Sequence, residues 1–256
     1  MIPEERRDGL LNMIKEKEIC AIETLVTHFG VSRITIQRDL THLENKGYIT
    51  KIHGGAKYRK QAQAGFETRF DIRYNLNYSK KLQVVQNALQ FVNSHSTIFI
   101  DSSTTSHIFG CEIMNSNFDE LNIITTSPSL ISEAMKKPES HIISTGGELR
   151  SYFSMLGGHL VLDFLDKVNI DSAFISAAGI SSEFKLTTSN LELSNILQKV
   201  IERSHEVNLL LDSTKIFKQA MNAITEIKNC KRVITDSGID KEAVKAIRSL
   251  GVGVIY

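Results

Sequence analysis

Residues 31–56, "VSRITIQRDLTHLENKGYITKIHGGA", combine arginine, glutamine, lysine and histidine with a helical pattern of isoleucine and leucine. Arginine can donate two hydrogen bonds to one guanine, and glutamine can pair with adenine in the same way. Residues 32–60 hold seven Lys or Arg and two Asp or Glu, whereas residues 1–31 hold four and six. The positive charge is therefore local, and it favours contact with a polyanion such as nucleic acid.

A helix that begins after Ser32 would position these side chains. Ser32 is a good N-cap residue, and Ile36, Leu40 and Leu43 follow the i, i+4, i+7 spacing of one buried helix face. The cap, the first turn and the opposite face would carry the residues expected to contact bases and phosphates: Ser32, Arg33, Ile34, Thr35, Gln37, Arg38 and Thr41. An exposed isoleucine at position 34 could pack on the methyl group of thymine.

Two earlier helices, over residues 4–16 and 21–29, and a hairpin are expected to support this helix. Gly30 supplies the turn before the third helix, and Gly47 is expected to end that helix. "YITKI" has the composition of a strand, and "HGG" turns it into "AKYRK", which adds Lys51 and His53 to the interface. We predict a winged helix-turn-helix domain over residues 1–58, with the helix-turn-helix at about 20–39, which presents one helix to the major groove. The alternative is a three-helix domain whose polar face is only solvated.

The rest of the chain alternates between helical segments and short apolar strands such as "TIFI", "IITT", "HIIS", "NLLL" and "GVGVIY". Strands that alternate with helices form a mostly parallel sheet covered on both faces. We therefore expect an α/β domain over residues 79–256. Residues 59–78 would form an ordered connector, because they contain no proline and a single glycine.

Polar residues follow several of these strands at their carboxyl ends, where ligands bind in such sheets. "DSSTT" offers hydroxyl groups and free amides at a helix start, "TGG" offers bare backbone, and "DSTK" offers a lysine, all suited to a phosphate. The residues expected to bind it are Asp101, Ser102, Ser103, Thr104, Thr105, Gly146, Gly147 and Lys215. Serine and threonine also cap helices, so a purely structural role is the alternative.

The segment over residues 31–56 resembles the DNA-binding signature of the DeoR family of bacterial transcriptional repressors, in which S-x-x-T-I-R-R-D-L precedes H-G-G-A. "IFIDSSTT", "ISTGGEL", "SMLGG", "FISAAGI" and "LLDSTKIF" are similar to ordered blocks of the family's sensor domain. The resemblance covers nearly the full chain. It implies a sensor fold similar to ribose-phosphate isomerases and glucosamine-phosphate deaminases, and the binding of a phosphorylated sugar.

The chain departs from the family pattern at three positions. Gln37 replaces the usual first arginine of the reading helix, so a different operator is expected. Ser103 replaces the glycine of "DSGTT", which narrows that loop. Ala178 replaces the aspartate of "ADGI", which removes a carboxylate partner for a sugar hydroxyl and implies a different effector.

Two classes of function follow from these residues. The favoured one is a sequence-specific transcriptional regulator, a repressor of a carbohydrate-utilisation operon, whose DNA affinity depends on a phosphorylated sugar. The alternative is a sugar-phosphate isomerase with an accessory nucleic-acid-binding module, in which Glu148, Glu183 or Glu192 would have to act as the base. We predict no catalytic residue, no cofactor and no metal, because the eight histidines show no HxH or HExxH spacing.

The expected partners are double-stranded operator DNA, a phosphorylated sugar and further copies of the chain. One reading helix buries little surface, so a homodimer or homotetramer on symmetric half-sites is expected. The chain has no long apolar run and begins with the charged "MIPEERRDGL", so we expect no membrane contact and a cytoplasmic protein. Cys20, Cys111 and Cys230 lack the spacing of a zinc site.

Overall fold

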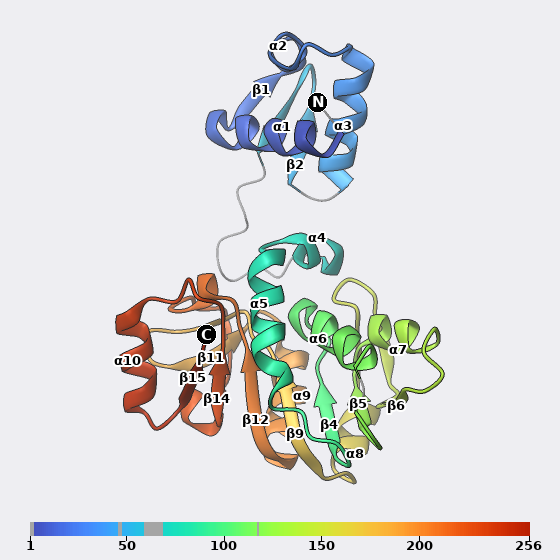
Figure 1. Cartoon of the computed structure of the whole chain (residues 1–256), viewed down its shortest axis with the longest axis vertical. Helices are drawn as coiled ribbons and strands as arrows, with labels where there is room; N and C mark the ends of the chain where they lie inside the picture. Colours follow the sequence, from blue (N-terminus) through green and yellow to red (C-terminus); the bar gives the residue numbers. More distant parts are fainter. Residues whose placement is uncertain (1–2, 46–47, 59–68, 117) are drawn as a thin grey trace. The chain divides into compact units, whose positions relative to one another are not determined.

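The computed structural model describes residues 3–45, 48–58, 69–116 and 118–256. Contacts within the chain divide it into two compact units, Met1–Gln63 and Ala64–Tyr256, and Figure 1 shows the elements of each. Within the described residues, no helix is long and apolar enough to cross a membrane.

The first unit contains three helices and a three-stranded sheet. The helices are α1 (Pro3–Lys17), α2 (Ile22–Phe29) and α3 (Arg33–Asn45), and the strands are β1 (Ile19–Ala21), β2 (Ile49–Ile52) and β3 (Gly55–Tyr58). The sheet has the order β1-β3-β2, and both of its pairs are antiparallel. The winged helix-turn-helix is therefore confirmed. The sequence pattern did not predict β1, and Gly47, where α3 was expected to end, lies outside the described residues.

The packing of α3 follows its sequence pattern. Ile36 and Leu40 are fully buried and Leu43 nearly so, in a core shared with α1 and α2. Gly30 ends α2 in the left-handed region, with φ at 63°, which a residue without a Cβ adopts without strain. The buried face thus fixes the orientation of α3, and the polar residues between the core positions point outward.

The second unit is built on a seven-stranded parallel sheet with the order β15-β14-β12-β9-β4-β5-β6. In that order the strands are Gly253–Ile255, Arg232–Ile234, Ser204–Leu210, Ile170–Ile175, Thr97–Ile100, Asn122–Thr125 and His141–Ser144. The helices are α5 (Tyr78–Leu89), α6 (Thr104–Met114), α7 (Pro128–Ala134), α8 (His159–Leu165), α9 (Leu191–Arg203) and α10 (Lys241–Ser249). The predicted α/β fold is confirmed.

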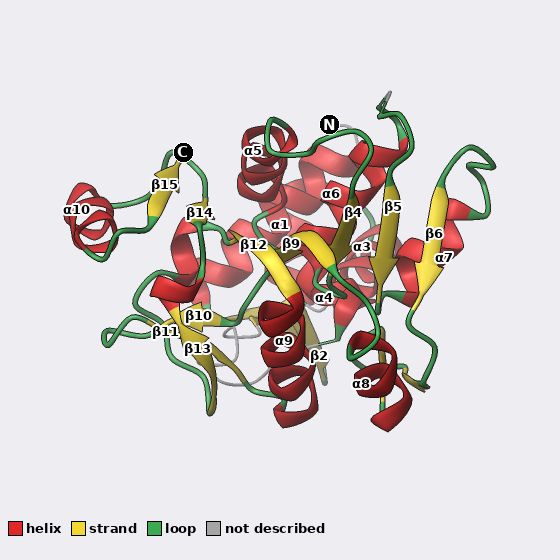
Figure 2. Cartoon of the chain, turned by 90° about the horizontal axis from the view of Figure 1, so that it is seen from below, coloured by secondary structure: helices red, strands yellow, loops and turns green. Residues whose placement is uncertain are grey.

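Helices cover both faces of this sheet (Figure 2). One hydrophobic cluster joins the strands to α5, α6 and α7, and another joins them to α8, α9 and α10. Because both faces are buried, the central strands are mostly apolar rather than alternating, although Asn208 lies buried inside β12. Most of their polar residues stand toward the strand ends.

Several shorter elements surround the carboxyl ends of the strands. Part of the predicted connector is a helix, α4 (Phe70–Asn75), which packs on α6. A hairpin of β7 (Glu148–Arg150) and β8 (Met155–Gly157) follows β6, and β10 (Gly179–Ile180), β11 (Lys185–Thr188) and β13 (Asn222–Glu226) form a small antiparallel sheet. Two 3-10 helices, Ser213–Lys215 and Ile227–Asn229, complete the unit. These elements are too short for a periodic pattern to predict them.

Candidate functional site

The exposed side of α3 carries the side chains expected to read bases. Gln37 and Arg38 are exposed, and Ile34 is 71% exposed although it is apolar. Ser32 caps the helix, because its Oγ accepts a hydrogen bond from the amide of Thr35 at 3.2 Å and lies 2.9 Å from the Thr35 hydroxyl. The structure thus places the predicted reading residues on one accessible surface, although the Ser32 and Thr35 hydroxyls contact each other.

A hollow of about 460 Å³ lies between α3 and strand β2 of the wing. Lys51 spans it, because its Nζ donates to the Thr41 hydroxyl at 3.0 Å and lies 3.6 Å from a Glu44 carboxylate oxygen. The predicted residues that border the hollow are Ile34, Gln37, Arg38, Thr41 and Lys51, with Ile52 added by the structure. This surface offers amide, guanidinium, ammonium and apolar groups to a ligand, which is the set that base edges and phosphates require.

Two predicted residues have other surroundings. Arg33 forms an ion pair with Glu23 of α2, with 2.5 Å between Nη1 and Oε1. His53 lies exposed in the turn between β2 and β3 and does not border the hollow. Arg33 must therefore leave Glu23 before it can contact a phosphate, whereas His53 is accessible without rearrangement.

A buried ion-pair cluster anchors the inner side of α3. Asp39 is 1% exposed and accepts hydrogen bonds from Arg6 at 2.7 Å and Arg7 at 2.9 Å, both on α1. Burial alone would raise the pKa of Asp39, but the hydrogen bonds and charges of the two arginines hold it below its ordinary value. Sequence reasoning did not assign this role, although an acid at a core-facing helix position is a signal for it.

The second candidate site lies where the parallel strands end. Asp101, at the end of β4, is 1% exposed, and burial raises the pKa of its carboxyl group. Its oxygens accept hydrogen bonds from the amides of Ser103 at 3.2 Å and Ser176 at 3.1 Å. Asp101 therefore ties the ends of β4 and β9 together, and it positions the loop around the site.

Hydroxyl groups line the same strand ends. Ser103 uses its hydroxyl to cap α6, accepting from the Ser106 amide at 3.2 Å. The hydroxyls of Thr105, Thr126 and Ser176 are buried and have no hydrogen-bond partner among the described residues. They follow β4, β5 and β9, which are neighbours in the sheet. Buried polar groups normally have partners, so three unsatisfied hydroxyls together indicate a place for a polar ligand. The sequence analysis included Thr105 but missed Thr126 and Ser176.

Two lysines approach this region. Lys215, in the 3-10 helix after β12, donates from Nζ to the carbonyl oxygen of Ala177 at 3.0 Å. Lys81 of α5 is only 3% exposed. Burial, and then the charge of Lys215, lower the pKa of Lys81 to about 7. Sequence reasoning missed Lys81, whose only signal was a lysine at a position that the helical period places toward the core.

The predicted glycines lie farther along the edge. Four strand spacings separate β12 from β6, which amounts to about 19 Å. Gly146 and Gly147 have φ angles of 69° and 103°. A Cβ on Gly147 would collide with the carbonyl oxygen of Gly157 in β8, so this glycine permits the close packing of the hairpin. In the order of the sheet, the glycine pair after β6 and Lys215 after β12 thus stand at the two ends of the proposed site.

The glutamates of the enzyme alternative all form ion pairs. Glu192 accepts from Arg150 at 2.9 and 3.0 Å and from the amide of Gly158 at 2.7 Å. The hydrogen bonds from Arg150 outweigh the effect of partial burial and lower the pKa of Glu192. Glu148 also pairs with Arg150, and Glu183 pairs with Lys185. Their charges are neutralised by cations, which disfavours their action as a base.

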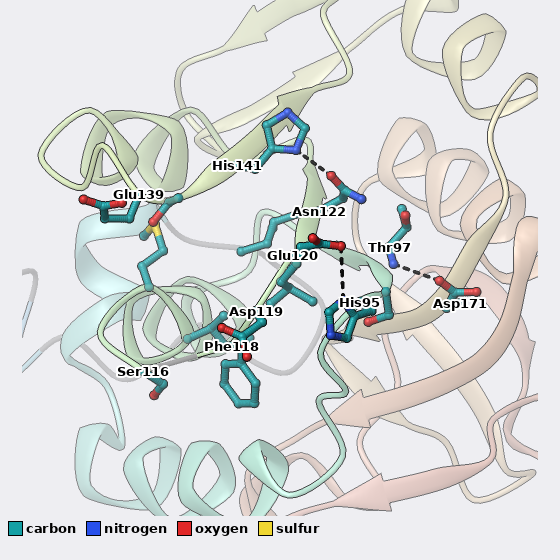
Figure 3. Close-up of a pocket in the computed structure, with 16 residues that line it drawn as sticks. His95, Thr97, Ser116, Phe118, Asp119, Glu120, Asn122, Glu139, His141 and Asp171 are labelled. Carbon is teal, nitrogen blue, oxygen red and sulfur yellow. Dashed lines mark hydrogen bonds and ion pairs between the residues drawn. The ribbon is translucent and has the colours of Figure 1, made fainter.

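A pocket of about 810 Å³ lies at the opposite edge of the sheet, where β4, β5 and β6 begin (Figure 3). His95 pairs with Glu120 at 3.1 Å, and the Thr97 amide donates to Asp171 at 2.8 Å. Among the described residues that line it there is no lysine or arginine, whereas four are acidic. This pocket does not suit a phosphate, and it is remote from the predicted site.

Both units match known domain families. Residues 6–62 match the DeoR-like helix-turn-helix domain, and residues 76–237 match the DeoR C terminal sensor domain. The chain is 29% identical to the HTH-type transcriptional regulator GolR of Listeria innocua over 254 residues, covering 99% of this chain and 98% of the relative. It is also 29% identical to the glycerol-3-phosphate regulon repressor of Escherichia coli, covering 91% of this chain and 90% of the relative.

A third relative and a solved structure complete the comparison. The lactose phosphotransferase system repressor of Staphylococcus epidermidis is 28% identical, covering 96% of both chains. The ribose 5-phosphate isomerase A of Methanocaldococcus jannaschii is 20% identical with a TM-score of 0.41, covering 55% of each chain. The named relatives are regulators rather than enzymes, which rules against the isomerase alternative. The chain belongs to the DeoR family of transcriptional regulators, with a helix-turn-helix domain followed by a sensor domain.

Proposed function

We propose that this regulator represses a carbohydrate-utilisation operon and that a phosphorylated sugar, bound in the second unit, changes its affinity for operator DNA. The observation that carries the proposal is the set of buried hydroxyls at adjacent strand ends that lack a hydrogen-bond partner among the described residues. Two lysines, the buried Lys81 and the half-buried Lys215, approach the same strand ends. Hydroxyls and ammonium groups together suit a ligand with both sugar hydroxyls and a phosphate. Two relatives are named as repressors of a glycerol-3-phosphate regulon and of a lactose phosphotransferase system.

In the first unit, α3 would enter the major groove. Arg38 and Gln37 provide the groups that discriminate guanine and adenine. Ile34 remains 71% exposed in the free protein, which is consistent with an apolar contact to thymine. Lys51 in the wing would neutralise a phosphate beside the reading helix. We assign residues 1–58 to DNA binding and residues 79–256 to effector binding.

In the second unit, the phosphate would bind between the start of α6 and the lysines. Thr104 and Thr105 begin α6, whose free amides favour an anion. Lys215 reaches the end of β9 from the end of β12, and β9 lies next to β4. Thr126 and Ser176 would then bind hydroxyls of the sugar, and the glycine pair after β6 would border the far end of the site.

We also propose that the chain acts as a homodimer or homotetramer in the cytoplasm. Symmetric half-sites require paired reading helices, because one helix contacts only a few base pairs. Sedimentation of the protein alone and on operator DNA tests this part, and a monomer on a single half-site would contradict it.

The experiment is a thermal-shift screen with sugar phosphates and their unphosphorylated sugars, followed by gel-shift titration with each stabilising compound. A ligand that binds the native state raises the melting temperature of the protein. We expect a phosphorylated sugar to stabilise the protein and to change its DNA affinity without being converted. Turnover of that compound would instead support the enzyme, and equal stabilisation by the free sugar would contradict a phosphate site.

A further inference from the structure

The last turn of α4 is fastened to the body of the second unit by Lys81. The Nζ of Lys81 donates hydrogen bonds to the carbonyl oxygens of Arg73 and of Tyr74, the latter at 3.3 Å. These carbonyls belong to the final turn of α4, where a helix leaves carbonyl groups without i+4 partners. The Arg73 carbonyl also accepts from the amide of Leu76 at 3.3 Å. A cation at this end of a helix is favourable, so the contact orders α4.

The other contacts of α4 are partial. None of its six residues is fully buried, five are half-buried, and Tyr74 packs against the hydrophobic cluster of α5, α6 and α7. Phe70 and Tyr74 place their rings 5.6 and 5.8 Å from the ring of His107 on α6. Arg73 donates from Nη2 to the carbonyl oxygen of Phe153 at 3.3 Å. A short helix with so few buried contacts has a low local stability, and one strong tie contributes a large part of it.

Lys81 also faces the proposed effector site. Asn77, one helical turn before Lys81, donates from Nδ2 to Asp212 Oδ1 at 3.3 Å and to the Thr214 hydroxyl at 3.1 Å. This side of α5 therefore lies against the loop after β12 that also carries Lys215. The hydrogen-bond acceptors that the described residues offer it are neutral carbonyl oxygens. A phosphate oxygen is a stronger acceptor for an ammonium group than a carbonyl is, because both partners are then charged.

We propose that Lys81 is a latch on α4: an anion bound at the strand ends takes the Lys81 ammonium away from the carbonyls of Arg73 and Tyr74 and thereby releases α4. The inference rests on the proposed function, since it takes the effector to be an anion. It adds how binding is transmitted, because α4 is the first described element of the second unit after the DNA-binding unit along the chain.

The latch gives the anion a different affinity for the two states of α4, because the anion and α4 compete for the Lys81 ammonium. A ligand shifts an equilibrium between two states only by the difference in its affinity for them. Here the anion binds better when Lys81 has left α4, and α4 is ordered better when the anion is absent. By linkage, any change that frees α4 should also strengthen anion binding by the same factor.

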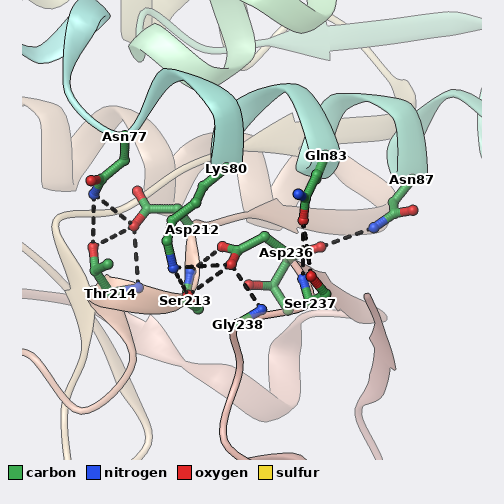
Figure 4. Close-up of polar contacts among 11 residues, drawn as sticks. Asn77, Lys80, Gln83, Asn87, Asp212, Ser213, Thr214, Asp236, Ser237 and Gly238 are labelled. Atoms are coloured by element: carbon green, nitrogen blue, oxygen red, sulfur yellow. Dashed lines mark hydrogen bonds and ion pairs between the residues drawn. The ribbon is translucent and has the colours of Figure 1, made fainter.

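The neighbouring lysine of the same helix provides a matched control. Lys80 points to the loops after β12 and β14, where its Nζ lies 2.6 Å from the Ser213 hydroxyl and 3.2 Å from an Asp236 carboxylate oxygen (Figure 4). Lys80 and Lys81 thus differ by one position and bind different partners. Replacing either by methionine removes one positive charge from α5, but only Lys81→Met removes the tie to α4.

The test is amide hydrogen exchange on the full-length protein. Exchange is measured by mass spectrometry in the proteolytic peptides that cover residues 69–76 and 102–112. Wild type, Lys81→Met and Lys80→Met are compared in chloride and in inorganic phosphate at equal ionic strength and at pH 6, where Lys81 carries its proton. Without phosphate, we expect residues 69–76 to exchange at least about tenfold faster in Lys81→Met, because a charge-assisted hydrogen bond is lost. Lys80→Met should leave this segment as in wild type. With phosphate, wild type should show faster exchange over residues 69–76 and slower exchange over residues 102–112.

Each result separates the latch from the proposed function. Equal exchange of residues 69–76 in Lys81→Met and wild type would overturn the latch. Phosphate protection of residues 102–112 with no change over residues 69–76 would also overturn it and would leave the effector site standing. Absence of any protection by phosphate would overturn the phosphate site and the anion-driven release together. The wild-type measurements need no substitution, so they decide the question even if Lys81→Met unfolds.

Discussion

Lys81 should make the stability of the second unit depend on pH in a way that Lys81→Met abolishes. The side chain is 3% exposed, and burial, followed by the charge of Lys215, lowers its pKa from 10.5 to about 7. Between these values the unfolded chain holds a proton at this site that the folded chain lacks, so the free energy of unfolding rises with pH. Below pH 7 both states are protonated, and the full cost of burying the charge remains.

The size of the effect on the free energy of unfolding follows from the same shift in the pKa of Lys81. A change of the pKa from 10.5 to about 7 corresponds to roughly 5 kcal/mol at most, or about 1.4 kcal/mol for each pH step between those values. Lys81→Met has no proton to lose. Its stability relative to wild type should therefore be highest at pH 6 and should fall by roughly 2 kcal/mol between pH 7 and pH 9.

Urea denaturation of both proteins at pH 6, 7, 8 and 9 measures this difference, with a spectroscopic signal from the second unit. Other titrating groups are common to both proteins and cancel in the comparison. Lys80→Met should keep the pH dependence of wild type, because Lys81 is intact in it. If the difference in free energy of unfolding between Lys81→Met and wild type stays constant from pH 6 to pH 9, folding does not lower the pKa of Lys81, and the argument is refuted.

Three further predictions concern the two sites. Arg38→Ala should weaken operator binding by about 1 to 3 kcal/mol in gel-shift titration at fixed salt without altering thermal unfolding, and unchanged affinity would show that Arg38 does not read bases. Lys51→Ala should weaken binding to specific and random DNA alike and lower the salt slope by roughly one, whereas an effect on the specific site alone would assign Lys51 to base reading. Lys215→Ala should abolish calorimetric binding of the phosphorylated sugar and leave DNA binding without ligand intact, and wild-type affinity in the variant would remove Lys215 from the phosphate site.

The reading surface could be predicted in detail because helix geometry alone decides it. Once Ile36, Leu40 and Leu43 point to the core, the direction of every other side chain on α3 is fixed by its position along the turn. The sequence did not reveal that Arg33 pairs with Glu23 or that Asp39 holds Arg6, since these contacts join helices that are distant in the chain.

The effector site was predicted only in outline. Parallel strands place all their carboxyl ends at one edge, so "DSSTT", "TGG" and "DSTK" had to share that edge. The order of the strands within the sheet was not encoded in any local pattern. That order places β9 between β4 and β12, and it puts four strand spacings, about 19 Å, between β12 and β6.

The sequence by itself determined the longer helices and the strands of the parallel sheet, which face of α3 is apolar, and hence the class of both domains. Those properties depend on the spacing of apolar residues within one segment, and this spacing can be read directly from the sequence. Only the tertiary structure decided which polar groups lack partners and which lysine is buried, as with Thr126, Ser176 and Lys81. Desolvation and hydrogen bonding depend on neighbours brought together from distant segments, so no local pattern can specify them.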